Sequence, residues 1–290
     1  MADSRCGLFC TGCAWKESNG CGGCIETMGN PFHGECVIAI CCQEKGYTHC
    51  GECALIPCPK LIQYSYLDPE HGDVPQGKRV EACRRWAAQS GKNVWNKVLL
   101  TSAGFENQNG TPKSNIIECF LSMLEMPVDE ANILFVPTAA VDKETRELAK
   151  LCKQQLINIG VKEERIHVYE IDGSMKEDEA MSYDVIYFTG GDTDYLLRCI
   201  KEAQFVKIIK KMVTANKVYV GVSAGSLIAT PNIGKVYEAR TSGLCLLNAY
   251  LDVHCNEQTP AREDLPLIHI PLTDNQAIAV SWEGYQLIEG

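Results

Sequence analysis

The segment KVYVGVSAGS at residues 217–226 decides how this sequence folds, because its apolar run ends abruptly at small residues around one serine. The β-branched residues of 217–222 predict a buried strand. The GVSAGS turn at 221–226 predicts a nucleophile elbow, in which a sharp turn lifts one hydroxyl above the sheet edge and a helix begins at once. Ser223 is therefore a candidate nucleophile, although an ordinary strand-to-helix turn with a capping serine has the same local pattern.

The chain as a whole has 290 residues, which fits one large or two modest domains, and its 46% hydrophobic residues suffice for a core. Its net charge of −10 argues against nucleic acid or an anionic membrane surface as the main partner, because both are bound by basic patches. No apolar run approaches the roughly 20 residues of a membrane span, and no signal-peptide core follows Met1. We expect a soluble cytoplasmic protein with a small ligand and no membrane partner.

Cysteines gather near the beginning of the chain, where twelve of the seventeen lie between Cys6 and Cys83. Three Cys-x-x-Cys pairs stand out, and in a cytosolic protein such pairs are metal ligands more often than disulfides. Two residues between cysteines let both sulfurs reach one tetrahedral ion. The candidate metal ligands are Cys10, Cys13, Cys21, Cys24, Cys41, Cys50, Cys53 and Cys58.

The metal itself is left open by the spacing, with structural zinc as the first interpretation. An iron–sulfur cluster is the second, because Cys6, Cys10 and Cys13 have the Cys-x3-Cys-x2-Cys spacing of radical SAM enzymes. More cysteine-rich sequence follows here, however, and not the barrel that those enzymes need. A thiol-redox or metal-free role is the third. Because so short a segment buries little apolar area, a metal would supply much of its folding energy.

This cysteine-rich block also resembles a known module. The segments CGLFCTGC, CGGC, CVIAICCQEKGYTHCGEC and IPCPKL are similar to a small cysteine-rich bacterial and archaeal domain of unknown function, over about residues 4–65. The resemblance implies a module without an assigned activity. With the composition shift to Pro, Gly and charge after it, we predict a metal-binding domain at 1–67, a connector with one helix at 68–95, and a second domain at 96–290.

The second domain alternates predicted strands and helices, which indicates an α/β fold with a mostly parallel, doubly wound sheet. Ligands of such sheets bind at the carboxyl ends of the strands. The segment FTGGDTDYLL at 188–197 follows one strand, and its glycines permit a close backbone approach to a ligand. We expect the N–H groups of Gly191 and Ala224 to face a developing oxyanion. Gly190 and Asp192 are candidate substrate contacts, although a glycine turn with a capped helix fits equally well.

Together, GGDTDYLL and GVSAGS are similar to motifs of the dipeptidase E and cyanophycinase group of serine peptidases, over about residues 96–290. The later segments LCLLNAYLDVH and TDNQAIAV resemble the closing strands of that group. The resemblance implies the fold of class I glutamine amidotransferases and a serine nucleophile at Ser223. It also places the catalytic base at His254, which ends a predicted strand after the elbow.

The remaining site residues follow from the same resemblance. A count of fifteen positions after the nucleophile gives Glu238 as the acidic partner of the histidine, and Asp252 is the alternative. Arg262 resembles the arginine that holds a substrate carboxylate in a bidentate fork.

The sequence therefore predicts a serine-type peptidase that hydrolyses dipeptides or short peptides, with Asp-X as a candidate specificity and no cofactor for the chemistry. The alternative is a non-catalytic binding or regulatory protein, in which a metal-bound domain recognises a partner beside a degenerate hydrolase scaffold. Glutamine amidotransfer needs cysteine at the elbow, so the serine at 223 disfavours it.

Overall fold

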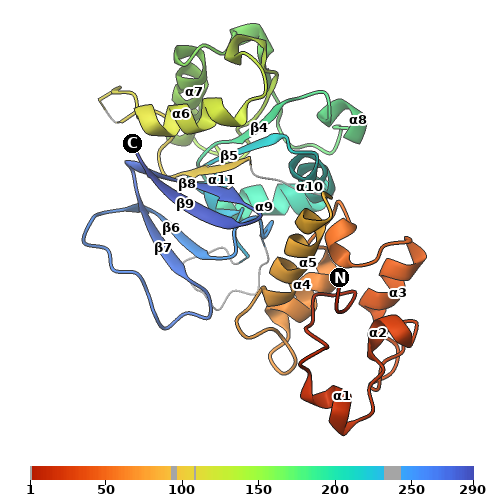
Figure 1. The fold of residues 1–290 in the computed structure, drawn as a ribbon. Coiled ribbons are helices and arrows are strands. Elements are labelled where there is room, and N and C mark those ends of the chain that lie inside the picture. The colour runs from red at the N-terminus through yellow and green to blue at the C-terminus, as the bar shows by residue number, and fades with distance from the viewer. Residues whose placement is uncertain (1, 93–96, 108, 232–242) are drawn as a thin grey trace. The chain divides into compact units, whose positions relative to one another are not determined.

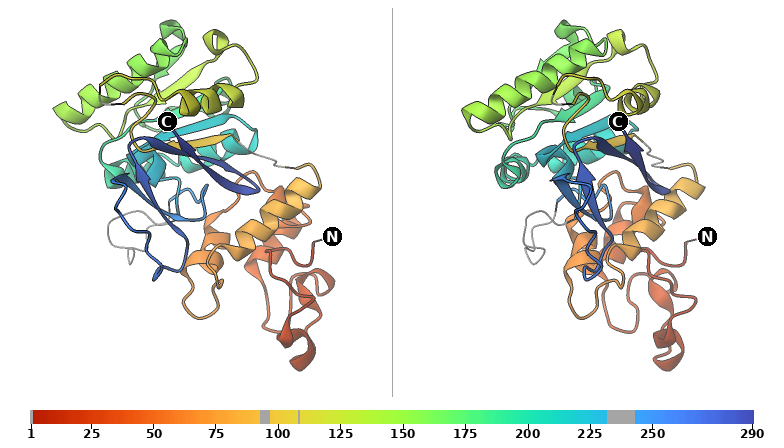
Figure 2. Two further views of the ribbon diagram at one scale, coloured as in Figure 1. Left: turned by 60° about the vertical axis from the view of Figure 1, so that its left-hand side comes forward. Right: turned by 90° about the vertical axis from the view of Figure 1, so that its left-hand side faces the viewer.

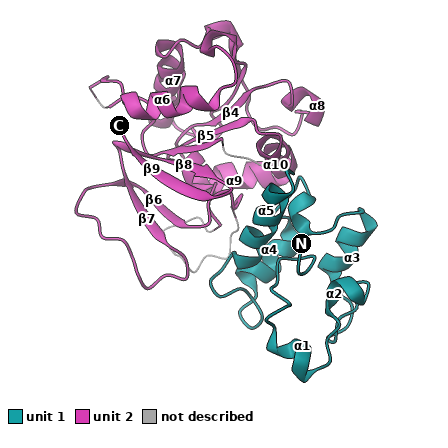
Figure 3. Ribbon diagram, in the orientation of Figure 1, with its two compact units in different colours: residues 1–94 teal, residues 95–290 magenta. Residues whose placement is uncertain are grey.

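The computed structural model describes residues 2–92, 97–107, 109–231 and 243–290, and the chain divides into two compact units, residues 1–94 and 95–290 (Figure 3). We call them unit 1 and unit 2. Within the described ranges, no helix combines the length and the apolar character that crossing a membrane requires.

Unit 1 consists of short helices and loops. Its elements are α1 (Ala14–Ser18), α2 (Gly23–Glu26), α3 (Val37–Glu44), the 3₁₀ helix η1 (Cys50–Glu52), α4 (Pro59–Ile62), the π-helical turn η2 (Gln63–Leu67) and α5 (Lys78–Gln89).

The longest helix of unit 1 is α5, which covers most of the helix predicted in the connector. It buries Val80, Cys83 and Ala87 almost completely, and this i, i+3, i+7 spacing places them on one face. The helix is also held by an ion pair between Arg79 and Asp73, with a nitrogen–oxygen distance of 2.7 Å and both side chains largely buried. Helix α5 thus belongs to the core of unit 1.

Unit 2 contains the strands β1 (Val98–Thr101), β2 (Ile133–Val136), β3 (Ile166–Val168), β4 (Val185–Phe188), β5 (Val218–Val222), β6 (Tyr250–Cys255), β7 (His269–Thr273), β8 (Gln276–Ser281) and β9 (Gly284–Glu289). Its helices are α6 (Ser114–Met123), η3 (Val128–Glu130), α7 (Lys143–Asn158), η4 (Glu163–Arg165), α8 (Glu177–Ala180), α9 (Thr193–Glu202), α10 (Val206–Thr214) and α11 (Ala224–Leu227).

In the described part of unit 2, seven strands form one sheet in the order β3-β2-β4-β5-β1-β8-β9. Figure 1 labels β4, β5, β8 and β9 of this sheet, and Figure 2 shows the same ribbon from two further sides. The five strands from β3 to β1 are parallel, and β8 and β9 continue the sheet as an antiparallel edge. A separate parallel pair consists of β6 and β7. The prediction of a mostly parallel α/β sheet is confirmed.

The core of unit 2 lies on both faces of this sheet. Successive residues of β1 alternate between the faces, so that Val98 and Leu100 pack with α9 and α10, while Leu99 packs with α6 and α7. Because helices cover both faces, strands β1, β2, β4 and β5 are buried at every position. Each fully buried aliphatic side chain contributes about 1.5–3 kcal/mol, so these strands form a rigid base for their carboxyl ends.

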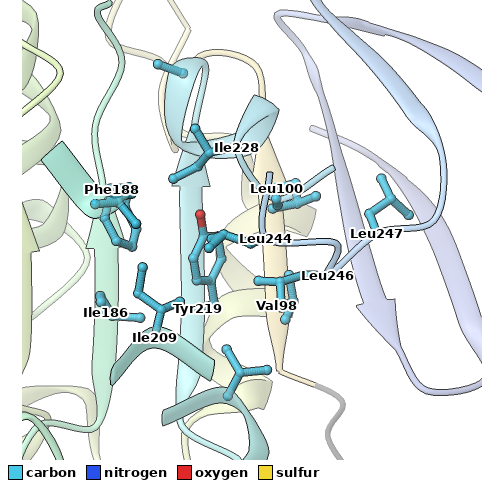
Figure 4. Packing of buried hydrophobic residues seen from close by; sticks show 14 of the residues in the cluster. Val98, Leu100, Ile186, Phe188, Ile209, Tyr219, Ile228, Leu244, Leu246 and Leu247 are labelled. Atoms are coloured by element: carbon cyan, nitrogen blue, oxygen red, sulfur yellow. The ribbon is translucent and has the colours of Figure 1, made fainter. Parts of the chain in front are cut away.

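One core residue connects this packing to the turn after β5. Tyr219 is fully buried among Val98, Leu100 and Phe188, as Figure 4 shows. Its hydroxyl donates a hydrogen bond to the carbonyl of Gly225, at 2.7 Å. The core therefore holds the backbone of α11 in place, directly behind Ser223.

Candidate active site

The turn after β5 has the geometry of a nucleophile elbow. Ser223 adopts φ 49° and ψ −107°, and α11 begins at the next residue. A non-glycine residue rarely takes such a positive φ, and strain of this kind is concentrated at functional sites. The two glycines of the turn are required by space, since a Cβ on Gly221 would lie 2.5 Å from the carbonyl oxygen of Gly225, and one on Gly225 would lie 2.6 Å from that of Phe188.

A histidine on β6 faces this serine. The Nε2 atom of His254 lies 2.9 Å from the Oγ atom of Ser223. The backbone of His254 also has a positive φ, 57°, and its N–H donates to the Oγ atom of Ser102 at 2.8 Å. The structure thus brings together the two residues that the sequence pointed to as nucleophile and base.

The carboxylate on the other side of the imidazole belongs to Asp274, in the turn between β7 and β8. Its Oδ1 atom lies 2.7 Å from Nδ1 of His254 and accepts a hydrogen bond from Ser102 at 2.8 Å. Burial opposes ionisation of this carboxyl, but the hydrogen bonds from Ser102 and His254 outweigh it and lower the pKa of Asp274. Asp274 is therefore ionised at neutral pH, as an orienting carboxylate must be.

The sequence offered two other acids, Glu238 and Asp252, as the partner of His254. Glu238 lies outside the described residues. Asp252, two residues before the histidine on β6, lies with its Oδ2 atom 3.0 Å from Nε2 of His269 instead. Sequence reasoning missed Asp274 and Ser102, although both follow strands: Ser102 follows β1, and Asp274 lies in the segment TDNQAIAV. The position of each polar residue directly after a strand could have indicated a site residue, because ligands of such sheets bind at the carboxyl ends of the strands.

The glycine pair after β4 lies beside the serine. A Cβ on Gly190 would be 3.1 Å from the Cβ of Ser223, and Gly191 lines the same cavity. Ala224 is the first residue of α11, where backbone N–H groups have no acceptor within the helix. Asp192 caps α9 by accepting from the N–H of Tyr195, at 2.8 Å. The assignment of Gly191 and Ala224 as oxyanion donors stays a prediction.

A larger residue at position 191 would overlap its neighbours, so a substitution there is expected to lower the stability of the fold. Its φ is +137°, and an added Cβ would lie 2.0 Å from the carbonyl oxygen of Ala139. We expect Gly191→Ala to lower the free energy of unfolding by about 2–5 kcal/mol, from backbone strain and overlap together. Gly173→Ala is the matched control, because Gly173 also has a positive φ, +83°, but its nearest neighbour lies at 3.8 Å. Urea denaturation compares them, and equal losses would contradict the role of the overlap.

A cavity of about 820 Å³ opens at these residues. Ser223, His254 and Asp274 line it together with Gly190 and Gly191. The other lining residues are Ser102, Ala103, Glu106, Asn107, Asn109, Gly110, Lys113, Leu148, Leu151, Cys152, Gln155, Val222 and Asn275. A cavity of this size accepts a ligand as large as a short peptide.

Arg262, predicted to hold a substrate carboxylate, is engaged elsewhere. Its Nε and Nη2 atoms donate to the two carboxylate oxygens of Asp264, at 3.1 and 2.6 Å. Arg262 is not among the residues that line the cavity. The bidentate fork therefore exists, but its partner in this structure is a neighbouring aspartate.

Several of the described cysteines of unit 1 lie close to one another. All seventeen cysteines of the chain are free thiols. The Sγ atoms of Cys42 and Cys50 are 3.5 Å apart, and Cys41, Cys53 and Cys58 line a small cavity with them. Throughout the described residues, however, no group of three or more His, Cys, Asp or Glu side chains is arranged to hold a metal ion. Zinc binding and a metal-stabilised unit 1 are therefore not confirmed and stay predictions.

Comparisons with known proteins agree with this division. The family model described as "Protein of unknown function (DUF3795)" matches residues 2–63. An uncharacterized peptidase of Listeria monocytogenes is 31% identical over 104 residues, 36% of this chain and 51% of that protein. A peptidase E of Haemophilus influenzae is 32% identical over 141 residues, 48% of this chain and 60% of that protein. The chain thus spans about half the length of the curated relatives it matches.

A solved structure, that of a putative peptidase E protein from Listeria monocytogenes, superimposes with a TM-score of 0.51 over 68% of this chain and 99% of that chain, at 23% identity, which supports the fold. The family model described as "Peptidase family S51" matches residues 98–286, which is more than half of the chain. Because this match spans more than half of the chain and includes the elbow and the turn that bears Asp274, the chain belongs to peptidase family S51.

Proposed function

We propose that unit 2 is a serine-type peptidase that hydrolyses short peptides through an acyl-enzyme on Ser223. One observation carries the proposal, namely the chain of contacts from Ser223 Oγ to His254 Nε2, at 2.9 Å, and from His254 Nδ1 to Asp274 Oδ1, at 2.7 Å. This is the arrangement of nucleophile, base and orienting carboxylate that activates a serine.

The tautomer of the neutral imidazole follows from its neighbours. The ionised carboxylate of Asp274 accepts hydrogen bonds and does not donate them, so Nδ1 of His254 carries the proton. Nε2 is then an acceptor and takes the hydroxyl proton of Ser223 as the oxygen attacks. Ser102 supports the arrangement, because it donates to Asp274 and accepts from the backbone of His254.

Acylation proceeds in two steps. The Oγ atom of Ser223 forms a bond to the peptide carbonyl carbon, while Nε2 of His254 accepts the hydroxyl proton and the carbonyl oxygen becomes an oxyanion. The N–H groups of Gly191 and Ala224 are proposed to stabilise this charge, and one such donor contributes about 3 kcal/mol to the transition state. The carbon–nitrogen bond then breaks, His254 returns the proton to the leaving amine, and an ester on Ser223 remains.

Deacylation repeats these steps with water. Nε2 of His254 takes a proton from a water molecule, which attacks the ester carbon. The new tetrahedral intermediate collapses, the carbon–oxygen bond to Ser223 breaks, and His254 gives the proton back to Oγ. The products are a carboxylic acid, an amine and the regenerated serine.

Short peptides fit this site better than folded proteins, because the reactive serine lies within a cavity of about 820 Å³. The specificity for Asp-X has less support, since Arg262 is bound to Asp264. A degenerate scaffold is disfavoured, because the three polar side chains have retained hydrogen-bonding distances.

Mass spectrometry of peptide mixtures after incubation with the full chain tests the proposal. We expect dipeptides and tripeptides to be cleaved at a single bond, while folded proteins of similar composition remain intact. A chain that leaves all short peptides uncleaved would contradict the proposed activity.

A further inference from the structure

A buried lysine lines the cavity next to the proposed catalytic residues. Lys113 immediately precedes α6 and is only 1% exposed. Its Nζ atom donates to the backbone carbonyl of Gly104, at 3.1 Å. An ammonium group has three N–H donors, so this carbonyl satisfies one of them. Among the described residues, no carboxylate lies within ion-pair distance of Nζ.

The local charges make this lysine suitable for an anion. Burial lowers the pKa of Lys113 to about 8, and the nearby carboxylate of Asp274 raises it only in part. Lys113 is the sole lysine or arginine among the described residues that line the cavity. The two acids that line it have other partners, because Asp274 accepts from Ser102 and Glu106 accepts from Asn158. An anion bound directly to Nζ would offset the cost of burying the ammonium group.

An apolar surface lies beside the lysine. Leu148 and Leu151 on α7 both line the cavity, and they are 54% and 57% exposed, whereas Ala149, Cys152 and Leu156 of the same helix are buried. One turn further along α7, the Oε1 atom of Gln155 accepts from the N–H of Phe105, at 2.9 Å. Phe105 follows Gly104, the residue that Lys113 contacts. The cation and the two leucines therefore line neighbouring parts of one wall.

We propose that this wall is a subsite for the C-terminal residue of the substrate, with Nζ of Lys113 binding its free carboxylate and Leu148 and Leu151 contacting its apolar side chain. The inference rests on the proposed peptidase function. A C-terminal leucine or methionine supplies both a carboxylate and an apolar group on one residue. An aspartyl side chain supplies a carboxylate but leaves the leucines without a partner. The subsite restricts cleavage to bonds near a free C-terminus.

The test combines a lysine variant with a matched pair of substrates. The parent chain and Lys113→Met are assayed with a dipeptide that ends in leucine, once as the free acid and once as the C-terminal amide. We expect the parent chain to prefer the acid in kcat/KM by about 10- to 150-fold, the range for a hydrogen bond to a charged group. In Lys113→Met, kcat/KM for the acid falls by this factor, while that for the amide changes less than about 3-fold.

Two further substrates, Asp-Leu and Asn-Leu, show whether Lys113 binds the C-terminal carboxylate of the substrate or an acidic side chain. Lys113→Met could lose the discrimination between Asp-Leu and Asn-Leu and still prefer the free C-terminal acid to the C-terminal amide. In that case the lysine binds an acidic side chain, and the proposal fails. Equal losses on acid and amide would also overturn it, since they indicate that Lys113 positions the loop or Asp274. An unchanged kcat/KM for the acid has the same consequence.

Arg262→Met is the control, because Arg262 is bound to Asp264 and does not line the cavity, so it should keep the acid preference. If Lys113→Met fails to fold, the parent chain alone still decides, because a parent that does not prefer the acid contradicts the subsite. Calorimetric binding of acid and amide to Ser223→Ala separates this inference from the proposed function. Absence of hydrolysis with selective acid binding would remove the activity but keep the subsite.

Discussion

Ser223→Ala is expected to lower kcat for peptide hydrolysis by about 10⁴-fold or more, the loss seen when the nucleophile of a serine peptidase is removed. The physical reason is that the variant retains the cavity and the proposed oxyanion donors but has no atom that can form the acyl-enzyme. KM should change little, because the Oγ atom contributes little to binding the substrate in its ground state. Steady-state kinetics with a dipeptide substrate measure both quantities.

Covalent labelling gives a readout that does not depend on the choice of peptide. A fluorophosphonate probe should form a bond to Ser223 in the parent chain and none in Ser223→Ala. Ser122→Ala is the matched control, because Ser122 lies exposed on α6 and its hydroxyl donates to the carbonyl of Cys119. Equal labelling of Ser223→Ala and the parent chain would refute the role of Ser223.

The serine and the histidine could be predicted because their signals are local. A β-branched run followed by GVSAGS requires a tight turn, and the space around Gly221 and Gly225 shows why larger residues do not fit there. His254 was predicted from the resemblance to the dipeptidase E group, and its strand β6 belongs to the separate pair of β6 and β7. Nε2 of His254 nevertheless lies 2.9 Å from Oγ of Ser223. Such patterns determine strand ends, and strand ends determine where side chains of an α/β fold meet.

The carboxylate that contacts Nδ1 of His254 could not be predicted in the same way, because its identity depends on how β6, β7 and β8 are arranged in space. Asp274 lies twenty residues after His254 along the chain, and only the turn between β7 and β8 brings it to Nδ1. Counting positions from the serine gave Glu238 instead. Lys113 and Arg262 illustrate the same limit, since a sequence does not reveal that one cation is buried and the other is bound to Asp264.

The cysteine-rich unit differs from both cases. The spacing of its cysteines predicts metal ligands, yet the thiols of the described residues are not arranged as a metal site. Burial raises the pKa of the Cys6 thiol to about 11, so this cysteine is protonated at neutral pH. The spacing of two residues brings sulfurs near one another, but it does not determine whether three or four of them converge on one point.

Asp274→Asn is expected to lower kcat by about 10²- to 10⁴-fold, with little change in KM. The reason is the tautomer of His254. An asparagine can direct its N–H₂ group at Nδ1, which then becomes an acceptor and leaves the proton on Nε2. Nε2 can no longer take the proton of Ser223, although the two atoms keep their separation of 2.9 Å. Stopped-flow or steady-state assays with the same dipeptide measure the loss.

Two other variants decide between the candidate acids. Asp252→Asn should change kcat less than about 3-fold, because Asp252 pairs with His269 and not with His254. Glu238→Gln should have an equally small effect if Asp274 orients the base. A large loss in Glu238→Gln with a small one in Asp274→Asn would reverse the assignment. Fluorophosphonate labelling adds an independent measure, since a serine without an oriented base reacts slowly even when every atom of the elbow is in place. Slow labelling of Asp274→Asn alone would therefore identify Asp274 as the residue that orients His254.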